Sequence, residues 1–164
     1  MGDRVTFIVP VQPRPKKGGK GKGEFFKVGA DGKSYWDHLQ EARKHCKAML
    51  KGAWAPVPHG QFVLVSQDMV FPRYARKPKW VPLEWWKSGA RFPRLVRPDA
   101  ENCGGFLLDA MQARKGDRPF AYHDDAQVEI GTWRRWVAAK GEPAHIVVTL
   151  ERVAWKVPPP DAPA

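Results

Sequence analysis

The sequence contains no apolar run long enough to cross a membrane. A membrane helix needs about 20 consecutive apolar residues, and no segment of the 164-residue chain approaches that length. The N-terminus also lacks the apolar centre of a secretory signal, because Arg4 and a segment rich in Pro, Lys and Gly interrupt it. We therefore expect a protein with no membrane segment that stays in the cytoplasm.

Cysteine is scarce as well. Cys46 and Cys103 are the only two; they stand in different segments, and neither has a second Cys or a His at zinc-ligand spacing. The sequence thus argues against a disulfide framework and against a structural zinc site. It favours buried or incidental thiols.

Acidic residues are few in comparison with basic ones. Asp and Glu number 17 against 28 Lys and Arg, which gives a formal net charge of +11. A surplus of positive charge attracts polyanions and releases their counterions on binding. Nucleic acid is therefore the partner that the composition favours, and a basic protein with no nucleic-acid role is the alternative.

The length is that of one compact domain that can bury a hydrophobic core. Hydrophobic residues make up 43% of the chain, which is ordinary for a globular protein. We expect a single domain over residues 1–156, followed by a flexible tail of Pro and Ala over 157–164. Within the domain, the composition predicts a basic loop over 12–34 and a basic insertion rich in Trp and Pro over 72–96.

Hydrophobic periodicity predicts the order strand, helix, strand, helix, strand, strand. That order is typical of an α/β or α+β domain built on a single small mixed sheet. Ser34 is the expected N-cap of the first helix, whereas Gly104 and Gly105 weaken the first turn of the second. The predicted strands cover residues 5–11, 61–71, 127–138 and 144–153, the two main helices cover 35–51 and 102–112, and the insertion allows a short helix over 83–87.

Two groups of basic residues are candidates for DNA binding. They would contact backbone phosphates and give affinity with little sequence preference, although a solvated loop explains the same composition. Three tryptophans of the insertion, Trp80, Trp85 and Trp86, either wedge against unstacked bases or, as we favour, cover apolar surface. The basic candidates are Lys16, Lys17, Lys20 and Lys22 in the loop, and Arg73, Arg76, Lys77 and Arg97 in and beside the insertion.

An acidic segment interrupts this basic chain. Residues 99–129 hold seven Asp and Glu against three Lys and Arg. These carboxylates would repel phosphates unless a hard cation such as Mg²⁺ binds them, and such an ion can activate water and stabilise a leaving oxygen. Asp99 and Glu101 would project to one side of an extended chain, and Asp125 could complete a metal site. A simpler interpretation stays open, in which these residues only cap a helix and form a turn.

The motifs in this segment resemble a known family. The similarity is to the RusA family of Holliday junction resolvases, which are crossover junction endodeoxyribonucleases with the pattern R-x-D-x-D-N-L-x-K, then D-A-L, then D-D-x-Q-V. It covers most of the chain, except for the insertion and the C-terminal tail, and it includes residues 28–35 before the first helix. The matching motifs here are Arg97-Pro98-Asp99-Ala100-Glu101-Asn102, Leu108-Asp109-Ala110-Met111 and Asp124-Asp125-Ala126-Gln127-Val128.

The resemblance implies a RusA-like homodimeric nuclease that nicks four-way DNA junctions symmetrically. It also implies that three acidic residues per subunit hold Mg²⁺, for which Mn²⁺ could substitute. Asp99 and Asp125 match the family's ligands, and Glu101 replaces its second Asp. The supporting positions are matched by Asn102, Asp109 and Asp124.

One departure from the family concerns catalysis. The family's catalytic Lys falls on Gly105, and such a Lys would stabilise phosphate charge in the transition state. Arg114, Lys115 or a basic residue of the loops could take its place. The departure leaves a second hypothesis open, a protein that binds branched DNA with weak or no nuclease activity. A third is a metal nuclease that acts on RNA or on flaps, since a carboxylate site does not choose its nucleic acid.

Overall fold

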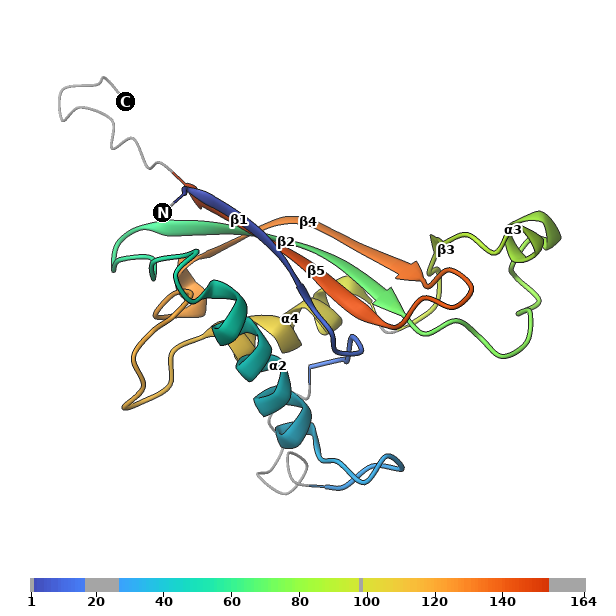
Figure 1. The fold of residues 1–164 in the computed structure, drawn as a ribbon, viewed down its shortest axis with the longest axis horizontal. Helices are drawn as coiled ribbons and strands as arrows, with labels where there is room; N and C mark the ends of the chain where they lie inside the picture. The colour runs from blue at the N-terminus through green and yellow to red at the C-terminus, as the bar shows by residue number, and fades with distance from the viewer. Residues whose placement is uncertain (1, 17–26, 98, 154–164) are drawn as a thin grey trace, which may run out of the picture.

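One mixed sheet and two long helices make up the fold (Figure 1). The computed structural model describes residues 2–16, 27–97 and 99–153, so the predicted tail over 157–164 lies outside it. Within these residues five strands form the sheet in the order β1-β5-β2-β4-β3. The strands are β1 (Arg4–Val9), β2 (Phe62–Phe71), β3 (Phe92–Pro93), β4 (Val128–Val137) and β5 (His145–Val153), and the helices are α2 (Tyr35–Leu50), α3 (Leu83–Ser88) and α4 (Ala100–Met111).

The sheet is mixed because one of its pairs is parallel. β2 runs parallel to β4, and β1–β5, β2–β5 and β3–β4 are antiparallel. A parallel pair needs a long crossover, and here the chain between β2 and β4 contains α3, β3 and α4. The predicted α+β fold with one small mixed sheet is confirmed. The short strand β3 is an addition that the sequence pattern did not predict.

Alternation along the strands places the core on one side of the sheet. In β1, Phe7 and Val9 are buried and Ile8 is 52% exposed, while in β2 Val63 and Val65 are fully buried. α2 and α4 pack against each other and against the strands on the buried side (Figure 1). The other side carries polar pairs such as Asp68 with Arg134 and is not covered by a described helix. Within the described chain, none of the helices has the length and apolar character that spanning a membrane requires.

A capping box starts α2 where the sequence predicts it. The Ser34 hydroxyl accepts a hydrogen bond from the Asp37 N–H at 3.2 Å, and the Asp37 carboxylate accepts from the Ser34 N–H at 2.7 Å. The box satisfies donors that the first turn leaves without partners. Bonds from Ser34 hold the pKa of Asp37 below its ordinary value.

The insertion forms a small unit that projects from one end of the sheet (Figure 1). α3 lies within it, and β3 attaches it to β4. Val81, Phe92 and Val137 are its buried apolar residues. Trp80 and Trp86 pack against them, whereas Trp85 is 40% exposed. The Trp85 ring nevertheless lies 6.3 Å from that of Phe92, so all three tryptophans contribute to covering this apolar surface.

Both cysteines are buried and free, as expected. Burial raises the pKa of the Cys46 thiol to about 12 and that of the Cys103 thiol to about 11. The thiolate is the reactive form, so neither residue is primed for chemistry at neutral pH.

Candidate functional site

Asp99 is the N-cap of α4. Its backbone is extended, with φ −71° and ψ 169°, and its Oδ1 accepts a hydrogen bond from the Asn102 N–H at 2.8 Å. Glu101 lies in the first helical turn, and both acidic side chains are exposed. The helix begins at Ala100, so the chain is not extended from Asp99 to Glu101. Residues two apart in a helix do not face each other, and the expected projection to one side therefore does not hold.

Asp124 and Asp125 stand at the start of a short 3-10 helix, η1 (Asp125–Gln127). The Asp124 carboxylate accepts from the Ala126 N–H at 2.7 Å. Gln127 is buried; its Oε1 accepts from the His123 N–H at 2.9 Å, and its Nε2 donates to the Pro58 carbonyl at 2.7 Å. Asp99 therefore caps α4 and Asp124 caps η1, as the simpler interpretation predicts. Asp125 is exposed.

The two acidic groups lie toward opposite ends of α4. Tyr122, just before η1, donates from its hydroxyl to the Leu108 carbonyl at 2.8 Å, near the end of the helix. Burial raises the pKa of Tyr122 well above its ordinary value, and the charges of Asp109 and Asp125 add to this effect. With a rise of about 1.5 Å per residue, Asp99 and Leu108 are separated by roughly 13 Å along the axis. Figure 1 shows η1 beside the C-terminal end of α4, away from its first turn.

Asp99, Glu101 and Asp125 are consequently not gathered in one cluster. Nowhere in residues 2–16, 27–97 and 99–153 do three His, Cys, Asp or Glu side chains come close enough together to hold one metal ion. Secondary structure explains why: α4 separates its own first turn from η1. Convergence of residues from two segments cannot be read from spacing alone.

The predicted carboxylates form no ion pair in the described chain. This holds for Asp99, Glu101, Asp124 and Asp125, although Asp109 pairs with Lys16 at 3.0 Å and Asp117 with Arg43 at 2.8 Å. Mg²⁺ in proteins keeps several waters and takes one or two carboxylates together with substrate phosphates. Asp99 and Glu101 are both exposed at the start of α4, where either could supply one carboxylate to such an ion. Asp125 lies toward the other end of α4, away from both of these carboxylates.

Lys16 lies along α4. Its N–H donates to the Asn102 carbonyl at 2.6 Å, and its Nζ donates to Asp109 Oδ1 at 3.0 Å. Between these contacts its side chain passes over Gly105, where an added Cβ would lie 2.9 Å from the Lys16 Cδ. The position at which the resemblance expects a lysine is therefore covered by a lysine from the N-terminal loop.

Gly104, the neighbouring glycine, serves a different contact. A Cβ at this position would overlap the six-membered ring of Trp133, and the Trp133 Nε1–H holds the ring by donating to the Val65 carbonyl at 2.9 Å. Gly104 thus lets α4 approach the sheet, and Gly105 lets Lys16 approach α4. Both glycines lower the helix propensity of α4, and each is explained by a close contact, Gly104 with Trp133 of the sheet and Gly105 with Lys16 of the N-terminal loop.

The basic candidates for DNA binding divide into two kinds. The Arg73 guanidinium donates to the carbonyls of Trp86, Ala90 and Ala138, and Lys77 Nζ donates to Val81 O at 2.8 Å. These two side chains hold the insertion together. Arg76 and Arg97 are exposed, with no side-chain partner in the described chain. Lys17, Lys20 and Lys22 lie outside the described residues.

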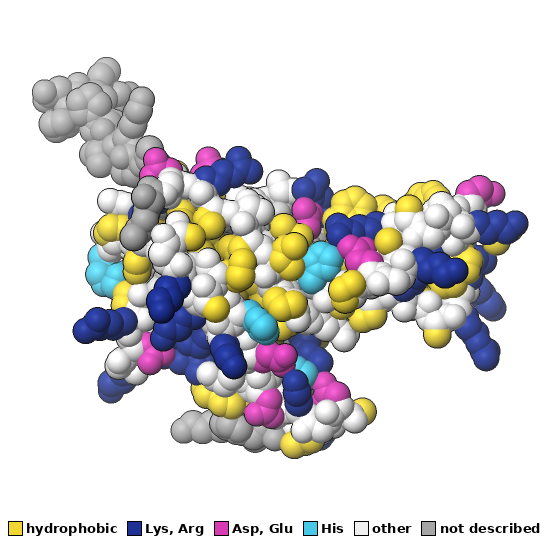
Figure 2. Space-filling model, in the orientation of Figure 1, with side chains coloured by type: hydrophobic (Ala, Val, Ile, Leu, Met, Phe, Trp, Pro, Cys, Tyr) yellow, Lys and Arg dark blue, Asp and Glu magenta, His cyan; other side chains and the backbone are white. Residues whose placement is uncertain are grey.

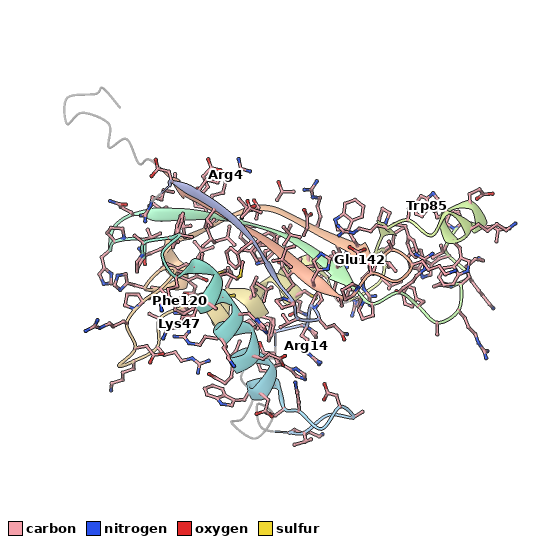
Figure 3. The ribbon with its side chains drawn as sticks, viewed as in Figure 1. Arg4, Arg14, Lys47, Trp85, Phe120 and Glu142 are labelled. Atoms are coloured by element: carbon pink, nitrogen blue, oxygen red, sulfur yellow. The ribbon has the colours of Figure 1, made fainter. Side chains whose placement is uncertain are left out.

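The structure gives the surroundings of cations that the sequence named only as members of a basic loop or as replacements for the missing lysine. Arg114 lies over the Trp36 ring at 4.3 Å, and Asp109 is one of the charges that act on it. Arg14, Lys27 and Lys33 line a hollow beside the start of α2; Figure 3 labels Arg14 in this region. Only their basic character was visible in the sequence, because the partners lie far away along the chain.

Basic side chains gather at two places on the face shown in Figure 2. One is the projecting insertion. The other surrounds the C-terminal half of α2 and the loop after α4, where Lys47 and Phe120 are labelled in Figure 3. Exposed Lys44, Lys47, Lys115 and Arg118 belong to these elements. The surface can therefore attract a polyanion at more than one point.

Three comparisons with known proteins found no match. Models of protein families, curated proteins and solved structures all give no match. The similarity to the RusA family thus rests on the quoted motifs.

Proposed function

We propose that the protein is a Mg²⁺-dependent, structure-selective DNA endonuclease that resolves Holliday junctions by paired symmetric nicks. Such an enzyme would act in DNA recombination and repair, as a homodimer in the cytoplasm. As the resemblance implies, Asp99, Glu101 and Asp125 would be its metal-binding and catalytic carboxylates, and Mn²⁺ could replace Mg²⁺. Because Asp125 lies toward the other end of α4, a single ion held by all three would require a rearrangement of the chain around α4.

The observation that carries the proposal is that the RusA-like motifs place exposed carboxylates in a strongly basic protein. Asp99, Glu101 and Asp125 are exposed and form no ion pair with a described residue, although the chain has a net charge of +11. Carboxylate oxygens are the ligands that Mg²⁺ prefers, and a bound ion would supply Lewis acidity at the scissile phosphate. All three stand in the RusA-like motifs.

The residues of the chain itself would bind and orient the DNA. Exposed basic side chains, Arg76 and Arg97 among them, would hold backbone phosphates. Asp99, fixed by its bond from the Asn102 N–H, has a defined position at the head of α4. Asn102, Asp109 and Asp124 would support the site by positioning the backbone and the neighbouring cations.

A second candidate is a protein that binds branched DNA with little or no cleavage. Two observations favour it: the three carboxylates do not form one group within the described chain, and residue 105 is Gly. The two candidates share a substrate and differ in whether a phosphodiester bond breaks.

One assay separates the candidates. The purified protein is incubated with a synthetic four-way junction, with linear duplex as a control substrate, in Mg²⁺ or in chelator. If the protein is a nuclease, it should nick the junction only in the presence of Mg²⁺. Asp99→Asn and Asp125→Asn should each reduce the rate of nicking at least 100-fold, which is the size of effect expected when a catalytic contact to developing charge is removed. Junction binding without product selects the second candidate, and equal cleavage by the variants contradicts the assigned carboxylates.

A further inference from the structure

We propose that Lys16 is a fixed phosphate-binding cation on the surface of α4, where it contacts a backbone phosphate of the bound nucleic acid. This inference rests on the proposed function for its ligand. The sequence named Lys16 only as one of four basic loop residues, and the structure adds the contacts that fix its position and an explanation for Gly105.

Three contacts hold Lys16 along the helix. Its N–H is bonded to the Asn102 carbonyl at the first turn, its aliphatic chain crosses Gly105, and its ammonium reaches Asp109 two turns after Asn102. A lysine on a free loop loses rotamer freedom when it binds an anion. Lys16 has already lost that freedom, and preorganisation of this kind favours binding.

The ammonium remains open to a ligand. The Lys16 side chain is 42% exposed, and that of Asp109 is 22% exposed. Asp109 acts on Arg114 as well as on Lys16. Within the described chain Asp109 is thus paired with Lys16 alone, while Arg114 adds a second positive charge within its electrostatic reach, which suits a phosphate diester.

A purely structural ion pair accounts poorly for the glycine. An exposed pair contributes little to stability, whereas Gly in a helix interior is unfavourable relative to Ala. If the pair served only to stabilise the fold, an Ala at residue 105 with Lys16 pointing to solvent would serve equally well. The close passage of Lys16 over Gly105 therefore indicates a use for the ammonium at this place.

The test is the salt dependence of binding to a four-way junction in chelator, so that no cleavage occurs. Lys16→Met removes the charge and keeps the length of the side chain. Arg4→Met is the matched control, because Arg4 is also an exposed, ion-paired cation but lies on the uncovered side of the sheet. Each variant lowers the net charge by the same amount.

A lost phosphate contact lowers the slope of log K against log salt by about 0.9. Lys16→Met should show that change and an affinity loss of roughly eightfold at 0.1 M salt, which follows from the same slope. Arg4→Met should show less than half of this change in slope. Lys16→Arg should restore the slope.

Two further variants separate binding from folding. Asp109→Asn keeps the charge of Lys16 and removes only the carboxylate that holds it, so the salt slope should stay close to that of the wild type. Gly105→Ala displaces the Lys16 chain, so the slope should fall toward that of Lys16→Met while the melting temperature is unchanged or higher. A structural pair would give the opposite pattern, with loss of stability in Lys16→Met and in Asp109→Asn and no change in slope.

The outcomes distinguish the two proposals. Wild-type protein that does not bind the junction overturns the proposed function. Wild-type protein that binds, with Lys16→Met and Arg4→Met indistinguishable, overturns only the role of Lys16.

Discussion

At the residue scale, adjacent glycines of α4 should respond to the same substitution with opposite sign. Gly104→Ala places a methyl group against the Trp133 ring, which its bond to Val65 prevents from moving. Overpacking of this kind should reduce the free energy of unfolding by about 1–3 kcal/mol. Gly105→Ala meets only the flexible Lys16 chain, so it should gain up to about 1 kcal/mol of helix propensity. Urea unfolding measures both, and equal effects of one sign would contradict this packing of the two glycines.

A pair of arginines in the insertion should separate stability from binding. Arg73→Gln removes donors to three carbonyls and the stacking of the guanidinium on Trp86 at 4.6 Å. The free energy of unfolding should fall by about 2 kcal/mol, and the melting temperature should fall with it. Arg76→Gln alters an exposed side chain, so DNA affinity should fall with the melting temperature unchanged. Thermal melts and junction-binding titrations check both. Lower affinity in Arg73→Gln alone, or a lower melting temperature in Arg76→Gln alone, would contradict these roles.

At the element scale, the capping box makes α2 sensitive to acid. The pKa of Asp37 is lowered in the folded state, because Ser34 donates to its carboxylate from both the backbone and the hydroxyl. A lowered pKa stabilises the fold above the ordinary Asp value of about 3.9, and this stabilisation is lost as the pH falls through the folded value.

The melting temperature of Asp37→Asn should therefore lie below that of the wild type at pH 7, and the gap should narrow as the pH falls below about 4. Thermal melts across pH 3–7 measure it, with Glu84→Gln as an exposed control in α3. A gap that is constant over this range would show that the charge of Asp37 contributes nothing.

Arg43 ties the end of α4 to α2. Its guanidinium donates to the carbonyls of Ala110 and Gln112 and to Asp117, and it lies over Phe120 at 5.0 Å. It thereby satisfies carbonyls that a helix end leaves unpaired. Arg43→Met should lower the free energy of unfolding by about 2–4 kcal/mol, whereas Lys44→Met, at an exposed neighbour, should change it by less than about 0.5 kcal/mol. Equal effects in urea unfolding would contradict this role.

Periodicity predicted the elements well because each one is coded locally. The bounds of α2, β2, β4 and β5 fall within a few residues of the expected ranges, since alternation and the Ser34 cap are properties of adjacent residues. The two-residue strand β3 is too short to show alternation. The contacts of Lys16 with Asp109, and of Arg43 with Asp117, join residues far apart along the chain, and no local pattern encodes them.

At the scale of the whole molecule, acidic groups sit within a basic frame but at separate places. The sequence predicted the acidic segment within a basic chain, because charge can be counted along the sequence. It did not predict that Asp99 and Asp125 lie toward opposite ends of α4, because both the length of the helix and the direction of the returning chain determine that separation. A symmetric pair of cuts further requires two such surfaces, which is why we propose a homodimer.

The most direct test is to map the nicks on a four-way junction whose four strands are end-labelled in turn. We expect Mg²⁺-dependent nicks at symmetric positions on two opposing strands, absent with chelator and with Asp99→Asn. An intact junction after prolonged incubation with Mg²⁺, or scattered cuts that Asp99→Asn leaves unchanged, would contradict the proposed nuclease.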